Sequence, residues 1–240
     1  MSTISVCLAA YNGERHIEEQ LRSILASPRV NEVIVSDDGS TDDTWQVVSN
    51  ISDPRVHLVH GPQAGLIRNF ESLLQRASGD VIFLADQDDV WLPNKVDMTM
   101  EALLSADLVV TDCAVVDAAL NVLVPSFRTA RGSGTGLLKN LMRNGYLGCC
   151  MAFKRSLLTK VLPFPADVPM HDWWIGIAAE RTSTVRFLNV PLVLYRRHGA
   201  NASPTSQRSP YGRMQQLSWR VRLLLATLKR HGLWARRPRA

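Results

Sequence analysis

The sequence predicts an α/β protein with a mostly parallel central sheet, helices on both faces of that sheet, and a basic amphipathic helix at the carboxyl end. Short apolar runs typical of buried strands recur through residues 4–111, and segments with helical apolar spacing separate them. Strands that alternate with helices form parallel, right-handed sheets covered on both faces. An apolar stripe within the arginine-rich segment 211–240 predicts the final helix.

The first half of the chain carries the strand and helix signals in alternation. Strands are expected at residues 4–9, 32–36, 56–59, 81–85 and 108–111. Helices are expected after the first four strands, because apolar residues recur there at helical spacing. Asn12 would cap the first helix, and Ser40 with Asp43 would form a capping box before the second.

The second half is less regular. A Gly/Ser-rich loop is expected at residues 131–136, helices at 137–143 and 172–179, and strands at 149–153, 185–188 and 192–195. The polar, Pro/Ser-rich segment 201–210 is typical of a flexible linker. The apolar face of the last helix is formed by Leu217, Val221, Leu224, Leu225 and Leu228. We therefore expect one domain at 1–200, a linker at 201–210 and a helix at 211–240.

Composition and charge limit the class of protein. An apolar content of 46% and a charged content of 20% fit a folded globular protein and exclude a disordered one. All 22 acidic residues lie at or before Glu180, whereas 13 of the 27 basic residues lie from Arg181 onward. A basic end after an acidic body indicates an anionic partner, either a membrane surface or a nucleic acid.

The sequence carries no signal for export. It begins directly with a strand pattern rather than a signal peptide, and no apolar run approaches the roughly 20 residues that span a bilayer. The four cysteines, Cys7, Cys113, Cys149 and Cys150, lack zinc-type spacing and are expected to be core thiols. We expect a cytoplasmic protein that is soluble or peripheral to a membrane.

Three carboxylates follow the strand expected at 81–85, in the run Asp86-Gln87-Asp88-Asp89. Open α/β sheets bind ligands at the carboxyl ends of their strands. Closely packed carboxylates there suit a hard cation such as Mg²⁺ or Mn²⁺. A helix N-terminus decorated with acidic residues, which favours the helix dipole, explains the same run equally well.

Two further motifs end neighbouring strands. Ala10-Tyr11-Asn12-Gly13 ends the first strand, and Asp37-Asp38-Gly39-Ser40-Thr41-Asp42 ends the second, so both would face the same crevice as the three carboxylates. Asp37 and Asp38 have the chemistry to bind a nucleotide base and its ribose, although Asp-Gly-Ser is also ordinary turn chemistry. Neither G-x-G-x-x-G after the first strand nor a P-loop sequence is present, so a dinucleotide fold or P-loop is not supported.

Taken in order, these motifs resemble glycosyltransferase family 2, whose members are inverting enzymes of the GT-A fold that use nucleotide-sugars. The resemblance includes Gly65 to Asn69 and Trp91-Leu92-Pro93-Asn94-Lys95, and it covers about residues 3–200. The ordered series is specific, whereas no single motif is. The D-Q-D-D-x-W variant is most similar to bacterial rhamnosyltransferases that build cell-surface polysaccharide such as lipopolysaccharide.

The resemblance assigns residues 1–112 to a nucleotide-binding half and residues 113–200 to an acceptor half. Asp88 would bind the Mg²⁺ or Mn²⁺ that bridges the diphosphate. The nucleotide-sugar would contact Ala10, Tyr11, Asn12, Asp37, Asp38, Arg68, Asp86, Gln87 and Lys95. Arg68 and Lys95 would meet phosphate as cations, and the alternative for both is an exposed charge on a helix.

Met170-His171-Asp172-Trp173-Trp174 resembles the family segment that carries the catalytic base. Asp172 would take the proton of the acceptor hydroxyl, and an apolar wall raises the proton affinity of such a carboxylate. Trp173 and Trp174 would offer flat faces on which the acceptor sugar stacks, and Gly148 would allow close approach of the backbone. The alternative is an aspartate that caps a helix before a buried aromatic pair.

Tyr195-Arg196-Arg197-His198 resembles a late family segment in which a histidine completes the metal site. His198 is therefore the second expected metal ligand. The alternative for this segment is that Arg196 or Arg197 binds the diphosphate instead. The Q-x-x-R-W signature of processive members is absent, which favours transfer of one sugar per encounter.

The resemblance implies an enzyme that moves one sugar, with inversion, from a nucleoside diphosphate donor to a free or lipid-linked saccharide. dTDP-rhamnose is the favoured donor, and UDP-sugars stay open. The less favoured alternatives are a sugar nucleotidyltransferase and a nucleic-acid-binding protein, and no nucleic acid is expected as a partner. The basic helix is expected to bind the anionic inner face of the cytoplasmic membrane, unless its leucines pack on the domain.

Overall fold

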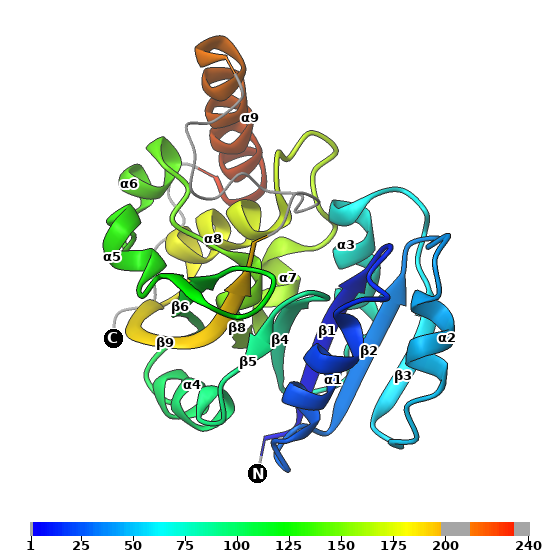
Figure 1. Ribbon diagram of the computed structural model, residues 1–240. Helices are drawn as coiled ribbons and strands as arrows, with labels where there is room; N and C mark the ends of the chain where they lie inside the picture. The colour runs from blue at the N-terminus through cyan, green and yellow to red at the C-terminus, as the bar shows by residue number, and fades with distance from the viewer. Residues whose placement is uncertain (1, 198–211, 233–240) are drawn as a thin grey trace.

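The computed structural model describes residues 2–197 and 212–232 of the 240-residue chain (Figure 1). The strands are β1 (Ile4–Ala10), β2 (Glu32–Asp37), β3 (Val56–His60), β4 (Val81–Asp86), β5 (Val90–Trp91), β6 (Leu108–Val116), β7 (Val122–Val124), β8 (Met151–Lys154) and β9 (Val185–Arg196). The α-helices are α1 (Ile17–Leu25), α2 (Thr44–Ser49), α3 (Leu66–Arg76), α4 (Lys95–Leu103), α5 (Phe127–Arg131), α6 (Leu137–Met142), α7 (Leu158–Val161), α8 (His171–Thr182) and α9 (Arg213–His231). Two 3-10 turns are η1 (Gly148–Cys150) and η2 (Arg155–Leu157).

The first part of the sheet is parallel, as the alternation of strands and helices predicts. Its strand order is β3-β2-β1-β4. Every residue of β1 is buried, and because alternate side chains of a strand point to opposite faces, both faces of the sheet are covered at this strand. Ala10 pairs with Asp37 and Ala9 with Asp86. The polar residues that end these three strands therefore lie side by side.

The second part of the sheet mixes strand directions. β8 lies antiparallel between β4 and β6, and β9 runs parallel to β6 and antiparallel to β5. The two late strands expected at 185–188 and 192–195 are one strand, β9, whose register against β6 shifts where Asp112 faces Pro191. Proline has no N–H to give to the ladder, which explains the irregularity there. The strand expected at 149–153 begins as the turn η1 and becomes β8 only at Met151.

Two predicted helix caps are wrong, because both side chains join loops instead. Asn12 has a φ of 51°, which asparagine tolerates better than most residues, and its Oδ1 accepts a hydrogen bond from the Thr41 N–H at 2.8 Å. Helix α1 begins only at Ile17, without a side-chain cap. The Ser40 hydroxyl donates to Asp37 rather than capping α2.

The core fills the space around the sheet with apolar side chains, and it includes all four thiols. Cys7, Cys113, Cys149 and Cys150 are buried and free of disulfides, as the sequence analysis expects. Trp174 is the largest fully buried side chain. It lies on α8, a helix with buried residues on every side, so α8 is a central element of the second half.

Helix α9 packs on the domain through a narrow side. Leu223 and Thr227 are buried against it, and the Arg230 guanidinium donates to the carbonyls of Leu162 and Pro163, each at 2.7 Å. The predicted apolar face is not the packed side, because Leu217, Val221, Leu224 and Leu225 are 40–59% exposed. No helix among the described residues is long and apolar enough to cross a membrane. The expected linker at 201–210 lies outside the described residues.

Candidate active site

A cleft of about 660 Å³ opens where β1, β2 and β4 end. Its walls come from these strand ends, from the start of α3, and from η1 and α8 across the cleft. The lining residues are Ala9, Ala10, Tyr11, Asn12, Asp38, Gly39, Gln63, Gly65, Leu66, Asn69, Asp86, Gln87, Asp88, Leu147, Gly148, Met170, His171, Asp172 and Tyr195. The convergence of the three strand-end motifs on one crevice is thus confirmed.

Asp38 shapes the wall of the cleft that follows β2. Its carboxylate accepts hydrogen bonds from the N–H groups of Gln63 at 2.7 Å and Gly65 at 2.8 Å, which fixes the loop between β3 and α3. Gly65 has a φ of 85°, a conformation that glycine adopts without strain. Asp37 is buried outside the lining and accepts from the Ser40 N–H at 2.9 Å. Its contact with a nucleotide stays a prediction.

Gln87 joins the loop after β4 to the loop after β1. Its Oε1 accepts from the Tyr11 N–H at 2.7 Å, and its Nε2 donates to the Tyr11 carbonyl at 2.9 Å. A Cβ on Gly13 would lie 2.3 Å from the same Oε1, so a larger residue there would displace the Gln87 amide. Tyr11 is 57% exposed and lines the cleft, where its side chain can meet a ligand.

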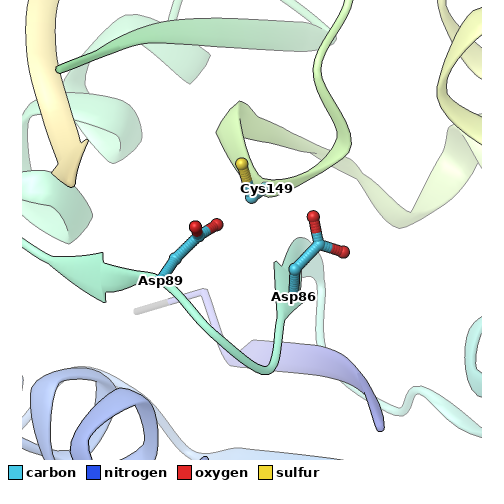
Figure 2. A group of neighbouring side chains, drawn as sticks. All are labelled: Asp86, Asp89 and Cys149. Carbon is cyan, nitrogen blue, oxygen red and sulfur yellow. The ribbon is translucent and has the colours of Figure 1, made fainter. Parts of the chain in front are cut away.

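Three carboxylates repel one another at the end of β4, of which Asp88 and Asp89 are buried and Asp86 is half-buried. Burial, with the charges of Asp88 and Asp172, raises the pKa of Asp86 to about 8. Burial, with the charges of Asp88 and Asp86, raises the pKa of Asp89 well above its usual range. The side chains of Asp86, Asp89 and Cys149 are neighbours (Figure 2), and one ligand atom from each lies within 4.8 Å of the others. A divalent cation bound among the aspartates would offset this repulsion, so the group of carboxyl groups fits such a cation.

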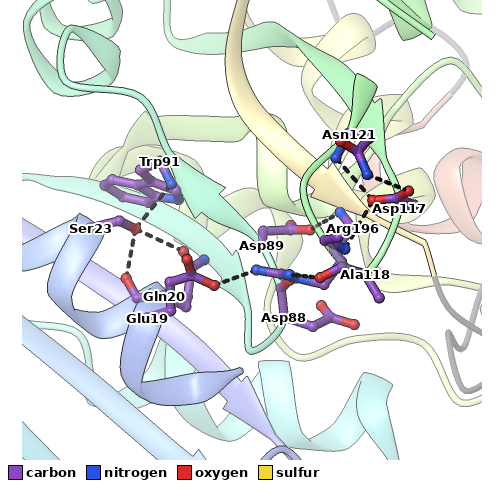
Figure 3. A network of polar contacts seen from close by, with 11 residues as sticks. Glu19, Gln20, Ser23, Asp88, Asp89, Trp91, Asp117, Ala118, Asn121 and Arg196 are labelled. Carbon is purple, nitrogen blue, oxygen red and sulfur yellow. Dashed lines mark hydrogen bonds and ion pairs between the residues drawn. The ribbon is translucent and has the colours of Figure 1, made fainter. Parts of the chain in front are cut away.

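Arg196 holds the Asp88–Asp89 turn in place, as Figure 3 shows. Its Nε donates to the Asp88 carbonyl at 2.8 Å and its backbone N–H to Asp89 Oδ1 at 3.1 Å. Its guanidinium also bonds to the Ala118 carbonyl and the Glu19 carboxylate. These contacts show that the buried Arg196 shapes the site. Its side chain does not fit the diphosphate contact that was the alternative for this segment.

Asp172 faces the carboxylates from the opposite wall, in the first turn of α8. Burial raises its pKa to about 6, although hydrogen bonds from the Trp173 N–H, the Asn144 side chain and the Gly148 N–H act in the opposite direction. A carboxyl group with this pKa ionises near neutral pH and has the proton affinity of an effective general base. Gly148 lines the cleft beside it.

The structure contradicts the sugar-stacking role of the two tryptophans. Trp173 is 7% exposed and Trp174 is fully buried, and neither lines the cleft. Their indole N–H groups donate to backbone carbonyls, from Trp173 to Asn140 at 2.7 Å and from Trp174 to Val161 at 2.9 Å. Both side chains are core residues that fix the position of α8.

The expected phosphate contact of Lys95 is also wrong. Its side chain is buried below η1, where the ammonium donates to the Cys149 carbonyl at 2.9 Å and lies 4.7 Å from the centre of the Trp91 ring. Arg68 forms an ion pair with Glu71 at 2.5 Å and does not line the cleft, so its phosphate contact stays a prediction. His198 lies outside the described residues.

Sequence reasoning missed other residues that line the cleft. Two of these lining residues, Asn69 and His171, are polar and buried. Each lies within a motif named above, but neither side chain was expected to have a role. Burial lowers the pKa of His171 to about 3, so the ring is neutral. The sequence pattern indicates Asp172 rather than its neighbour His171, because a carboxylate has one obvious role in catalysis, whereas a single histidine fits several different roles.

The sequence matches the family model described as "Glycosyl transferase family 2" over residues 5–162. Curated relatives resemble most of the chain, among them two bacterial glycosyltransferases. One is the UDP-Glc:alpha-D-GlcNAc-diphosphoundecaprenol beta-1,3-glucosyltransferase WfgD of Escherichia coli, 24% identical over 85% of this chain and 80% of its own. The other is the dTDP-rhamnosyl transferase RfbG of Shigella flexneri, 26% identical over 82% of this chain and 75% of its own.

Solved structures share the fold. The chain resembles a crystallised part of TarS of Staphylococcus aureus, in complex with UDP-GlcNAc, with a TM-score of 0.71, 18% identity, and coverage of 97% of this chain and 68% of that crystallised part. It also resembles the mannosyltransferase PcManGT of Pyrobaculum calidifontis, in complex with GDP-Man and Mn²⁺, with a TM-score of 0.59, 20% identity, and coverage of 99% and 66%. These likenesses show the architecture of the chain.

Proposed function

Because the chain belongs to glycosyl transferase family 2 and has a fold of the GT-A type, we propose that it transfers one sugar, with inversion, from a nucleoside diphosphate donor to a saccharide acceptor. One observation carries the proposal. A buried aspartate with raised proton affinity, Asp172, faces a group of buried carboxylates across a single cleft. Asp172 is suited to act on the acceptor, and the group of carboxylates is suited to the donor side.

Asp172 acts as the general base in this proposal. Its carboxylate accepts the proton of the acceptor hydroxyl as the oxygen bonds to the anomeric carbon, and the bond from that carbon to the diphosphate breaks on the opposite side. Attack from that side inverts the anomeric centre in one displacement, without a covalent intermediate. The Gly148 N–H and the Asn144 side chain orient the carboxylate through their hydrogen bonds.

Residues at the end of β4 would hold a divalent cation. Asp88 is the main proposed ligand, and Asp86 beside it lines the same cleft. His198 remains a proposed ligand on the resemblance alone. Bound Mg²⁺ or Mn²⁺ would neutralise charge on the departing diphosphate. Burial and, after it, mutual repulsion raise the pKa values of Asp86 and Asp89, and the repulsion supports the proposal because a cation would relieve it.

dTDP-rhamnose is the donor that we favour, with surface polysaccharide as the product. The dTDP-rhamnosyl transferase RfbG among the relatives supports this donor. The UDP-Glc-dependent glucosyltransferase WfgD supports the alternative, a UDP-sugar, and its diphosphoundecaprenol-linked acceptor supports a lipid-linked acceptor here. The test is incubation of the purified protein with a panel of nucleotide-sugars and candidate acceptors, with and without Mn²⁺. Transfer from none of them would refute the proposed function.

The rate of transfer is expected to rise with pH through about 6 and to level off above it. The reason is that Asp172 must be ionised to accept a proton, and burial raises its pKa from 3.8 to about 6. An exposed aspartate would keep the rate constant over this range. The measurement is kcat at saturating substrate from about pH 5 to about pH 8. A kcat that falls with pH over that range would contradict the assignment of Asp172 as the base.

Helix α9 supports attachment to an anionic membrane. Its exposed apolar side chains (Leu217, Val221, Leu224 and Leu225) are accompanied by the exposed Arg213, Arg222 and Lys229. The apolar surface continues onto α6, where Leu138 and Met142 are exposed and the Met142 carbonyl accepts from Arg220 at 3.0 Å. Apolar side chains flanked by basic ones bind anionic interfaces. A lipid-linked acceptor would give this attachment a purpose.

Full-length protein is expected to co-sediment with anionic vesicles and not with neutral ones, and salt should release it. Each basic residue near an anionic surface contributes about 1 kcal/mol. Val221→Asp combined with Leu225→Asp should keep the protein in the supernatant, because both side chains are exposed and the substitutions remove apolar surface from α9. Leu123→Asp, at an equally exposed position on β7, is the matched control and should still sediment. Equal sedimentation of all three proteins would exclude α9 as the membrane contact.

A further inference from the structure

His171 is a buried polar side chain of the cleft, and its ring nitrogens lack a hydrogen-bond partner in the part of the chain that the structure describes. It is the first residue of α8, is 2% exposed, and lines the cleft. Neither Nδ1 nor Nε2 has a hydrogen-bond partner within residues 2–197 and 212–232. The next three residues of α8 all have partners for their polar side chains. Buried polar groups are almost always paired, so an unpaired imidazole in a cleft indicates a ligand.

The ring of His171 has a fixed orientation. It stacks on Phe70 of α3, with ring centres 3.9 Å apart and planes 20° from parallel. A Cβ added to Gly148 would lie 2.8 Å from His171 Nε2 and 3.8 Å from Asp172 Cβ. Nε2 therefore lies against the bare α-carbon of Gly148, and the N–H of the same Gly148 bonds to the Asp172 carboxylate. His171 and Asp172 thus converge on one side of the cleft.

The charge of the ring limits what it binds. Burial lowers its pKa to about 3, so at neutral pH one ring nitrogen is a donor and the other an acceptor. A neutral imidazole gains less than a cationic one from a phosphate or carboxylate. A hydroxyl group, which both donates and accepts, matches it in either tautomer. Sugar rings carry such groups next to the carbon that reacts.

We propose that Nε2 of His171 hydrogen-bonds a hydroxyl group of a sugar ring held beside Asp172, and so positions that ring for transfer. The inference rests on the proposed function and adds a binding residue to it. The hydroxyl belongs either to the acceptor or to the sugar of the donor. Both sources offer the same chemistry, and the experiment separates them.

The test compares three substitutions at position 171 in the full-length protein. His171→Leu removes both nitrogens, His171→Gln places an amide nitrogen near the position of Nε2, and His171→Asn places one near Nδ1. His171→Leu is expected to weaken binding of one saccharide about tenfold, the effect of one hydrogen bond. His171→Gln should recover most of this loss, and His171→Asn should not. His57→Leu, on the exposed edge strand β3, is the control and should match the wild type.

Two measurements identify the sugar. A raised KM for the acceptor, with donor binding unchanged, assigns the hydroxyl to the acceptor. Weaker calorimetric binding of the nucleotide-sugar, with unchanged binding of its nucleoside diphosphate, assigns it to the donor sugar. An equal loss for the nucleoside diphosphate, or identical kinetics in all three variants, would overturn the inference. A wild-type protein that transfers no sugar would instead refute the proposed function.

Thermal unfolding separates a binding role from a structural one. Replacing an unpaired buried imidazole with leucine should leave the melting temperature unchanged or raise it, because no hydrogen bond is lost and a desolvated polar group is removed. A structural role for the ring predicts the reverse. A fall in melting temperature with unchanged saccharide binding would therefore also overturn the inference.

Discussion

Replacing Asp88 with alanine is expected to abolish sugar transfer while the protein stays folded. Asp88 lies in the turn after β4 and lines the cleft, and its charge is a cause of the raised pKa values of Asp86 and Asp89. Removal of this charge relieves repulsion in the ligand-free protein, so folding should not suffer. The expected loss lies in the cation site, because one carboxylate fewer remains to bind Mg²⁺ or Mn²⁺.

Three measurements check this expectation. Turnover is measured with added Mn²⁺, binding of Mn²⁺ is measured by calorimetry, and the melting temperature reports folding. Asp97→Ala is the matched control, since this aspartate makes only an exposed ion pair with Arg29 and lies outside the cleft. Near-normal turnover of the Asp88→Ala protein in excess EDTA would show that the metal assignment is wrong.

Replacing Asp172 with asparagine is expected to lower turnover at least about 10²-fold, the usual effect of losing a general base. Asparagine keeps nearly the same shape and still accepts hydrogen bonds, so the neighbouring backbone should keep its position. It does not accept a proton near neutral pH. The loss should therefore appear in kcat and leave the affinity for the donor nearly unchanged.

The affinity for the donor shows whether Asp172 acts as the general base or belongs to the donor site. Binding of the nucleotide-sugar to the Asp172→Asn protein is measured directly by calorimetry, apart from turnover. Asp167→Asn, a change at an exposed side chain close in sequence, is the control and should leave both quantities as in the wild type. If donor binding to the Asp172→Asn protein falls along with turnover, Asp172 belongs to the donor site or to the structure.

The parallel half of the fold was predictable from the sequence because its signals are local. Each strand from β1 to β4 is a short apolar run, and its polar residues follow directly in the chain. The position of Asp38, Asp86 and Asp88 in one cleft follows from strand direction alone. In the second half, strand directions depend on which segments meet, and the antiparallel position of β8 between β4 and β6 has no local signal.

The side-chain errors share a physical cause. Helix α8 is buried on all sides, so no amphipathic pattern indicates which of its residues face the cleft, and its tryptophans were wrongly assigned to the acceptor. Lys95 follows a proline and has the sequence context of a surface residue, yet its ammonium is satisfied by a carbonyl 54 positions away in the sequence. Asn12 and Ser40 bond across loops, and their sequence pattern equally fits helix caps.

The paired hydrogen bonds between Gln87 and the backbone of Tyr11 have a thermodynamic consequence. They close a ring between two loops that are 76 positions apart in the sequence, so neither loop samples new conformations independently of the other. A ligand that enters this side of the cleft therefore meets a preorganised surface and does not have to order both loops. The conformational entropy was already lost when the protein folded, and more of the contact free energy remains available as affinity.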